Sequence, residues 1–352
     1  MTTDTTGNTE TLASPPPAMT QQEAVRLART LFGLPVEQAE LMTAERDQNL
    51  RLTAADGQRW VMKVANSAED REVTDFQTAA LCHVERTTPD LPVPRVQRSV
   101  SGKTEVLARL SDGRCSVVRV LSWMDGLPLV HAPRSARQRR NLACCHARLG
   151  RAFAGFSHPG QEHYLQWDIS NLDRVAPLLL YVEGDDIRAM VAGVLTDFRR
   201  EAKPALPDLR RQVIYNDLNF HNVLVDPYDP DRIAGIIDFG DIIAAPLVND
   251  LAVAASYQFG SAGVRADVAE FIAAYHRQLP LTGNEIRLLP LLIEARLAMT
   301  LLITGYRAIR YPENADYILR NNMPARVALA EMRSRSPQDN AEWVNLALEN
   351  SR

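Results

Sequence analysis

The segment from Val213 to Asp241 constrains the fold of this chain more than any other part of the sequence. It reads VIYNDLNFHNVLVDPYDPDRIAGIIDFGD, with β-branched residues concentrated in 223–225 and 233–237. A turn rich in Asp and Pro separates the two runs, so the pattern predicts a β-hairpin. The hairpin would bring Asn222, just before its first strand, close to Asp238, at the end of its second strand.

Three polar side chains of this segment have the chemistry of a magnesium site. Asp217, Asn222 and Asp238 supply carboxylate and amide oxygens, the hard ligands that Mg²⁺ takes together with substrate phosphates. Asp and Asn also flank turns for local hydrogen-bonding reasons, and Asp-Phe-Gly by itself is weak evidence. The complete order of an Asp, an Asn five residues later, a hairpin and Asp-Phe-Gly favours a phosphoryl-transfer site.

This order of residues resembles the catalytic and metal-binding loops of the protein-kinase-like superfamily. More narrowly, the chain looks like the aminoglycoside phosphotransferase and choline kinase family. Its Asn-Asp-Leu-Asn and Gly-Ile-Ile-Asp-Phe-Gly-Asp runs look most like the hydroxylysine kinase branch. The resemblance implies that Asp217 is the catalytic residue and that Asn222 and Asp238 bind the metal. The chain departs from the family at Tyr215, which replaces the usual histidine of the catalytic loop.

The resemblance also implies an α+β, bilobal protein-kinase-like fold. A small N-terminal lobe with an antiparallel sheet would bind the nucleotide, and a larger, mostly helical C-terminal lobe would carry the catalytic and substrate residues. We assign residues 19–123 to the first lobe and 124–352 to the second. Residues 1–18 are rich in Thr, contain three consecutive prolines and have few apolar side chains, so we expect a disordered tail.

The expected N-terminal lobe starts with a helix and continues with short strands. Thr20 and Glu23 have the spacing of a capping box, and apolar residues at helical spacing follow until Gly33. Residues 39–64 alternate short apolar runs with polar turns, which predicts an antiparallel meander. A second helix is predicted from about residue 69 to 84.

Lys63 lies in the middle of an apolar strand, where a lysine most often points to solvent. The resemblance instead implies that Lys63 contacts the nucleotide phosphates and pairs with a polar residue of the following helix. Glu72 and Asp75 are the carboxylates on that helix, and we take Asp75 as a candidate for the nucleotide site. A simple alignment of this helix with the family places Gln77 at the position of the partner. Glu72, Asp75 and Gln77 therefore all stay open as the helix partner of Lys63.

Two further segments are assigned to the nucleotide through the resemblance alone. Residues 45–49 join two strands where the family places a loop over the phosphates, and Asn49 is the candidate contact. The strand that ends near Met124 corresponds to the hinge, so backbone groups of Ser122 and Met124 would bind the purine edge. Without the resemblance, the first segment is a polar turn and the second an ordinary strand end.

The region after the hinge is predicted to be mainly helical, and four of its residues are candidates for the acceptor site. Trp167 and Asp168, in a loop between helices, would offer an aromatic face and a charge to an ammonium group. A core Trp beside a helix-capping Asp explains the pair equally well. Asp241 would bind a substrate ammonium or a second ion, and the resemblance places Arg296, on a late helix, near the acceptor. Asp250 is implied to be structural.

The composition excludes several other classes of protein. The chain has 352 residues, of which 46% are hydrophobic and 23% charged, as in an ordinary globular protein. A net charge of -4 argues against a general binder of nucleic acid or anionic membranes and suits a small cationic substrate. The four cysteines have no metal-ligand spacing, the start of the chain lacks a signal-peptide pattern, and charged residues interrupt the most apolar run, 286–304. We therefore expect a cytoplasmic protein without a membrane span.

The sequence thus predicts a kinase that transfers the terminal phosphate of ATP or GTP, with Mg²⁺, to a hydroxyl of a small molecule. The expected acceptor is an amino alcohol or a hydroxy amino acid similar to hydroxylysine; aminoglycosides, choline or ethanolamine, and homoserine are the alternatives. A catalytically inactive nucleotide-binding scaffold is the alternative of another class, and Tyr215 is among its few supports. No nucleic-acid or membrane partner is expected, and the protein would be a monomer or a homodimer.

Overall fold

The structure, a computed structural model, describes residues 16–43, 47–260 and 264–349. These residues form two compact units. The first contains the described chain up to Asp125 together with Phe156–Tyr164 and Gly235–Gly240. The second contains Gly126–Gly155, Leu165–Ala234 and the described chain from Asp241 onward. Most of the predicted tail and part of the predicted phosphate loop, residues 45 and 46, lie outside the described residues.

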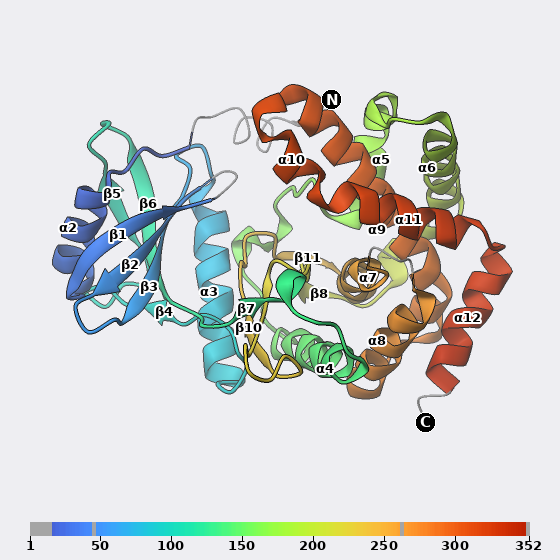
Figure 1. The fold of residues 1–352 in the computed structure, drawn as a ribbon, viewed down its shortest axis with the longest axis horizontal. Coiled ribbons are helices and arrows are strands. Elements are labelled where there is room, and N and C mark those ends of the chain that lie inside the picture. The colour runs from blue at the N-terminus through green and yellow to red at the C-terminus, as the bar shows by residue number, and fades with distance from the viewer. Residues whose placement is uncertain (1–15, 44–46, 261–263, 350–352) are drawn as a thin grey trace. The chain divides into compact units, whose positions relative to one another are not determined.

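The first unit is built on an antiparallel sheet with the strand order β1-β2-β3-β6-β4, and β5 pairs with the other part of β6 (Figure 1). The three predicted strands of the meander are confirmed as β1 to β3. The elements in chain order are α2 (Gln21–Phe32), β1 (Val36–Met42), β2 (Gln48–Ala54), β3 (Arg59–Val64), α3 (Arg71–Thr87), β4 (Val96–Gln97), β5 (Val106–Arg109) and β6 (Cys115–Ser122).

Helix α2 begins and ends where the sequence predicts. The Thr20 hydroxyl accepts a hydrogen bond from the Glu23 N–H at 3.1 Å, and Gly33 ends the helix with φ 65°, a value that favours glycine. The second half of the predicted capping box is wrong, because the Glu23 carboxylate instead accepts hydrogen bonds from the backbone N–H and the hydroxyl of Ser111. This contact joins α2 to the loop between β5 and β6.

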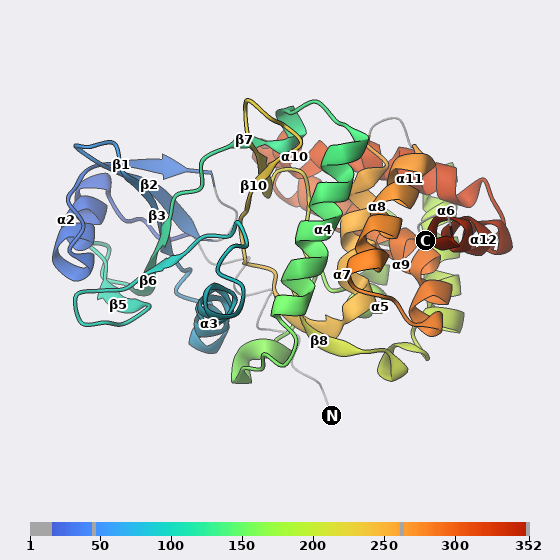
Figure 2. The same ribbon diagram turned by 90° about the horizontal axis from the view of Figure 1, so that it is seen from below.

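The two faces of the sheet have different partners because side chains alternate along a strand. Trp60, Met62 and Val64 of β3 are buried in one hydrophobic cluster with the apolar face of α2. Lys63 therefore projects to the opposite face, as does Arg119 of β6, whose guanidinium donates to the backbone of α3. Figures 1 and 2 show α2 and α3 on opposite sides of the sheet.

The second unit is mainly helical. Helices α4, α8, α7 and α9 pack in succession (Figure 2). The sequence pattern predicts helices over 246–259, 264–279 and 284–309, and α7, α8 and α9 confirm them. The helices are α4 (Ala136–Ala152), α5 (Leu172–Val175), α6 (Asp185–Asp197), α7 (Leu247–Gln258), α8 (Arg265–Gln278), α9 (Gly283–Arg310), α10 (Ala315–Ile318), α11 (Asn322–Arg333) and α12 (Pro337–Glu349). Two short strands, β8 (Arg211–Ile214) and β11 (Ile243–Pro246), pair antiparallel.

The predicted hairpin is confirmed. Strands β9 (Val223–Val225) and β10 (Ile233–Ile236) lie next to each other in a sheet of order β10-β9-β7, where β7 is Leu127–Pro128. The Asp226 N–H donates to the Arg232 carbonyl at 3.0 Å and closes the turn. Strand β7 follows the predicted hinge directly, and its pairing with β9 was not expected from the sequence.

The segment 156–164 corrects one sequence prediction. The apolar spacing of Leu142, Cys145, Leu149, Ala152 and Phe156 predicts one helix that includes all five residues, but α4 ends at Ala152. Phe156 instead belongs to the first unit, where its ring stacks on Phe76 of α3 with centroids 6.1 Å apart. Gly160 makes this packing possible, because a Cβ atom at this position would lie 2.3 Å from the Glu72 carbonyl oxygen.

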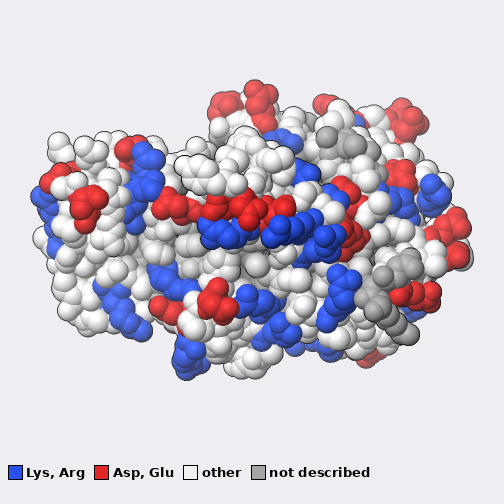
Figure 3. Space-filling model, turned by 60° about the horizontal axis from the view of Figure 1, so that its bottom comes forward, with Lys and Arg blue, Asp and Glu red and all other residues white. Residues whose placement is uncertain are grey.

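Basic and acidic side chains are interspersed on the face shown in Figure 3, in keeping with 39 Lys and Arg against 43 Asp and Glu in the sequence. In the part of the chain that the structure describes, no helix has the length and the apolar character needed to cross a membrane.

Candidate active site

The loop that carries Asp217 is anchored to the core of the second unit. Asn216 has a positive φ of 64°, which Asn tolerates better than most residues, and its N–H donates to Asp250 Oδ1 at 2.7 Å. Asp250 Oδ2 lies 2.9 Å from His146 Nε2, and both side chains are fully buried. Tyr215 is also fully buried. Asp250 thus supports the loop as implied, and Tyr215 occupies the core beside it.

The Asp217 carboxylate is held by three side chains of the second unit. Its Oδ1 accepts a hydrogen bond from Asn219 Nδ2 at 2.9 Å, and its Oδ2 accepts one from Asn222 Nδ2 at 2.6 Å. Arg296 Nη2 lies 3.8 Å from Oδ1. Asp217 is 21% exposed, so the carboxylate is oriented and still accessible, as a general base must be. The sequence had not indicated Asn219, although it lies only two residues from Asp217.

Arg296 is buried behind Asp217. Its side chain is 2% exposed, donates to the Trp167 carbonyl at 2.9 Å and to the Tyr257 hydroxyl at 3.4 Å, and lies 4.9 Å from the Trp167 ring centre. Burial alone would lower the pKa of Arg296, yet the pKa is raised because Tyr257, Asp217 and Asp241 favour the charged form. The guanidinium is therefore a permanent cation that supports Asp217.

The other acceptor candidates have structural partners of their own. Asp168 is 6% exposed and caps a short 3-10 helix (Ile169–Asn171) by accepting the Ser170 N–H at 2.9 Å, and burial raises its pKa. The Trp167 ring contacts Arg296. This geometry matches the core Trp and capping Asp that the sequence left open, and an acceptor role for Trp167, Asp168, Asp241 or Arg296 stays a prediction.

In the first unit, Lys63 contacts the Asp-Phe-Gly segment. Lys63 Nζ lies 3.1 Å from Asp238 Oδ1, with Lys63 12% and Asp238 49% exposed. Asp238 has a positive φ of 61°, and its Oδ1 also accepts the Gly240 N–H at 3.2 Å. The lysine that was assigned to the nucleotide and one predicted metal ligand are therefore neighbours.

The helix partner expected for Lys63 is absent among the described residues. Asp75 of α3 contacts His158 Nε2 at 3.1 Å rather than Lys63, and Glu72 makes no ion pair with Lys63 either. Gln77 is buried, donates to the Gly240 carbonyl at 3.0 Å and accepts from Arg119. Helix α3 is thus connected to the Asp-Phe-Gly segment through an uncharged glutamine.

Gln77 is held in turn by a buried arginine that the sequence analysis did not identify. Arg119 is 4% exposed and also donates to the Thr74 carbonyl and the Thr78 hydroxyl. In the antiparallel pair β3–β6, Arg119 lies directly across from Lys63. A buried charge needs several hydrogen bonds, and these neutral acceptors supply them. The only sequence pattern that could have indicated Arg119 is its place as a lone arginine within the apolar strand β6.

The three other residues assigned to the nucleotide lie at strand ends of the first unit. Asn49 of β2 faces Lys63 across the ladder, and its buried Oδ1 has no hydrogen-bond partner among the described residues. The Ser122 N–H donates to the Arg95 carbonyl at 2.8 Å, whereas the Met124 N–H makes no hydrogen bond to any residue that the structure describes. Met124 is therefore better suited than Ser122 to offer its N–H to a purine.

The predicted metal ligands fit Mg²⁺ in their chemistry. The Asn222 amide N–H donates a hydrogen bond to the Asp217 carboxylate, so the amide oxygen is the atom offered to a ligand. Asp238 offers a half-exposed carboxylate. One or two such oxygens suffice for Mg²⁺, which completes its coordination with water and phosphate oxygens. Asn222 belongs to the second unit and Asp238 to the first, so their convergence on one ion stays a prediction.

Comparison with known proteins decides the family. The sequence matches the phosphotransferase enzyme family over residues 43–287. The chain belongs to this family. It is therefore an enzyme, a phosphotransferase with an alcohol group as acceptor, and the resemblance read from the 213–241 segment is confirmed.

Individual relatives agree with this assignment over most of the chain. The chain is 25% identical to a hydroxylysine kinase of Mus musculus over 331 residues, 87% of each protein. Among solved structures, it is similar to a microcompartment-associated aminopropanol kinase (TM-score 0.69, 18% identity, 89% of this chain and 97% of the other). It is also similar to an amicoumacin kinase solved with AMP-PNP and Ca²⁺ (TM-score 0.65, 14% identity, 90% and 94% covered). The predicted protein-kinase-like α+β fold is confirmed.

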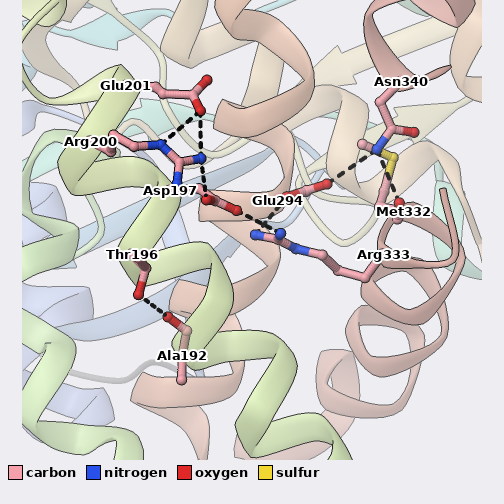
Figure 4. A network of polar contacts seen from close by, with 9 residues as sticks. All are labelled: Ala192, Thr196, Asp197, Arg200, Glu201, Glu294, Met332, Arg333 and Asn340. Carbon is pink, nitrogen blue, oxygen red and sulfur yellow. Dashed lines mark hydrogen bonds and ion pairs between the residues drawn. The ribbon is translucent and has the colours of Figure 1, made fainter. Parts of the chain in front are cut away.

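Glu294 of this phosphotransferase does not share a helix face with Arg296, because the two residues are two positions apart on α9. It belongs to a polar network with Asp197, Arg333 and Asn340, of which Glu294 and Asn340 are buried (Figure 4). Glu294 lies 3.0 Å from Arg333 Nη2 and accepts from Asn340 Nδ2 at 3.4 Å. Burial raises the pKa of Glu294 to about 7, and Asp197 adds to the shift while Arg333 and Arg265 oppose it.

This shift predicts a pH-dependent stability. Because folded Glu294 holds its proton more tightly than the unfolded chain does, its contribution to the free energy of unfolding is present below pH about 4.5 and is lost as the pH rises to about 7. Between pH 5 and 8, the free energy of unfolding of the wild type should fall by about 2 to 3 kcal/mol relative to that of Glu294→Gln. Denaturant titrations of both proteins at several pH values measure this difference, and a difference independent of pH would contradict the prediction.

Proposed function

We propose that this phosphotransferase transfers the terminal phosphate of ATP or GTP to the hydroxyl of an amino alcohol or of a hydroxy amino acid similar to hydroxylysine. The observation that carries the proposal is the accessible Asp217 carboxylate, oriented by Asn219, Asn222 and Arg296. The similarity to a hydroxylysine kinase along most of the chain supports the acceptor class. The amicoumacin kinase bound to AMP-PNP supports a nucleotide as phosphate donor.

Each residue has one task in the proposed reaction. Asp217 accepts the proton of the acceptor hydroxyl, or orients its oxygen in line with the terminal phosphate. Lys63 contacts the nucleotide phosphates, and Asn222 and Asp238 would hold Mg²⁺. When bound, Mg²⁺ neutralises phosphate charge. Because phosphoryl transfer requires mainly positioning and charge stabilisation, the contacts that orient Asp217 are central to it.

Two other kinds of function are weighed against this one. A homoserine kinase of Methylobacillus flagellatus is 34% identical over 136 residues, 38% of each protein, which keeps homoserine among the acceptors. An inactive scaffold would not need an accessible, oriented Asp217, and the replacement at Tyr215 affects a buried position. A cytoplasmic location and a monomeric or homodimeric state stay predictions.

A screen of purified protein tests the proposal. ATP and GTP are each combined with hydroxylysine, homoserine, ethanolamine, choline and an aminoglycoside, with Mg²⁺ or with excess chelator, and nucleotide diphosphate and phosphorylated product are measured. We expect product with hydroxylysine or a related amino alcohol, and none with chelator. Nucleotide binding without product from any acceptor would favour the scaffold.

A further inference from the structure

A pocket of about 480 Å³ lies within the second unit beside the catalytic loop. Phe220 and His221 of that loop line it, and so does Tyr257. The Tyr257 hydroxyl accepts a hydrogen bond from Arg296, whose guanidinium contacts Asp217. Tyr257 thus connects the pocket to Asp217 through Arg296, and the volume of the pocket suits a small molecule.

Two arginines line this pocket without a carboxylate partner. Arg134 donates to the Gln258 amide oxygen at 2.7 Å, and its guanidinium lies 4.2 Å from the Phe220 ring centre. Arg320 donates to the Tyr317 carbonyl at 2.9 Å. Both of these acceptors are neutral, and one buried guanidinium nitrogen of each arginine has no hydrogen-bond partner in the part of the chain that the structure describes.

The remaining charges of the pocket do not balance these arginines. Asp267 also lines it and favours the charged form of Arg134, but its ion pair is with Arg139, at 2.9 Å. Burial lowers the pKa of Arg134 to about 10, so Arg134 is charged at neutral pH. A pocket with two unpaired guanidinium groups attracts an anion, and their planar forks match a carboxylate.

The relatives do not decide whether the acceptor carries a carboxylate, because hydroxylysine has one and aminopropanol does not. We propose that Arg134 and Arg320 bind the carboxylate of the acceptor, which makes the acceptor a hydroxy amino acid rather than an amino alcohol. The inference rests on the proposed function and narrows it. The acceptor would then carry a carboxylate besides its ammonium group or groups.

Matched pairs of acceptors test the inference. Hydroxylysine, homoserine and threonine are each compared with the amine that remains when the carboxyl group is removed, and kcat and KM are measured with saturating magnesium nucleotide. For the pair that is turned over best, we expect kcat/KM to be at least about tenfold higher for the amino acid. Equal or faster turnover of the amine would overturn the inference while leaving the proposed kinase function intact. Absence of turnover for all six compounds and for the other acceptors of the screen would overturn both.

Variants that remove one positive charge test whether Arg134 and Arg320 contact the acceptor carboxylate. Arg320→Gln and Arg134→Gln should each raise KM for the amino acid about 10- to 100-fold, change KM for the amine little, and so abolish the preference. Arg310→Gln removes the same charge from an exposed position at the end of α9 and should behave like the wild type. Two variants are used because Arg134 also packs on Phe220; circular dichroism confirms that each is folded. A preference that survives in both folded variants would overturn the assignment of the pocket.

Discussion

Replacing Asp217 with Asn is expected to lower kcat by about 10²- to 10⁴-fold, the range that a general base contributes. Asn has the same shape as Asp but cannot accept the proton of the acceptor hydroxyl. Because Asp217 is assigned to the acceptor and not to the nucleotide, affinity for the magnesium nucleotide should stay close to that of the wild type. Steady-state kinetics and calorimetric titration with a non-hydrolysable nucleotide measure the two quantities separately.

A matched control for this change is Asp226→Asn. Asp226 lies in the turn of the β9–β10 hairpin, nine residues from Asp217 in the sequence, and pairs with exposed Arg232. It should retain wild-type kcat. If Asp217→Asn retained wild-type kcat as well, Asp217 would not be the base, and the proposed mechanism would be wrong.

Replacing Arg296 with Met is expected to have the second largest effect. The change removes a buried cation and leaves the Trp167 carbonyl, the Tyr257 hydroxyl and one side of Asp217 without their partner. A buried polar group left without its partner costs about 1 to 3 kcal/mol. We expect a lower melting temperature, a kcat reduced at least about tenfold and an unchanged KM for the nucleotide.

The pH dependence separates a positioning role of Arg296 from a purely structural one. Without the neighbouring cation, the ionised form of Asp217 is less favoured, so the acidic limb of the kcat/KM profile should move to higher pH. Arg296→Lys keeps the charge and should return the acidic limb of the kcat/KM profile to its wild-type pH. It should recover only part of the lost stability, because an ammonium cannot reproduce the guanidinium hydrogen bonds. An unshifted profile in a folded Arg296→Met protein would show that Arg296 does not act through Asp217.

Local patterns predicted the main elements of this protein well. The hairpin, the meander and the long helices follow from β-branched runs, turn residues and apolar spacing, all of which act within a few residues. The errors arise where a side chain has a distant partner. Glu23 caps the Ser111 loop instead of its own helix, and Phe156 leaves the α4 pattern to pack on Phe76.

The residues of the candidate site show the same difference between groups close in sequence and groups far apart in sequence. Asp217, Asn222 and Asp238 were identified from their order along the chain, because the loop and the hairpin that present them are continuous in sequence. The partners that orient them were not, since Arg296 lies 79 residues beyond Asp217 and Arg119 contacts Gln77 from 42 residues away. Asp75 was chosen as a helix carboxylate near Lys63, but α3 directs it to His158.

The sequence by itself determined the family and the order of the elements and predicted the reactive side chains, because these depend on residue types at short spacing. Only the tertiary structure decided which buried groups hold Asp217, that Gln77 rather than a carboxylate connects α3 to the Asp-Phe-Gly segment, and that Arg134 and Arg320 line one pocket. The physical reason is that a buried charge is stabilised by whichever polar groups packing brings within a few ångströms, and distance along the chain does not predict which groups those are.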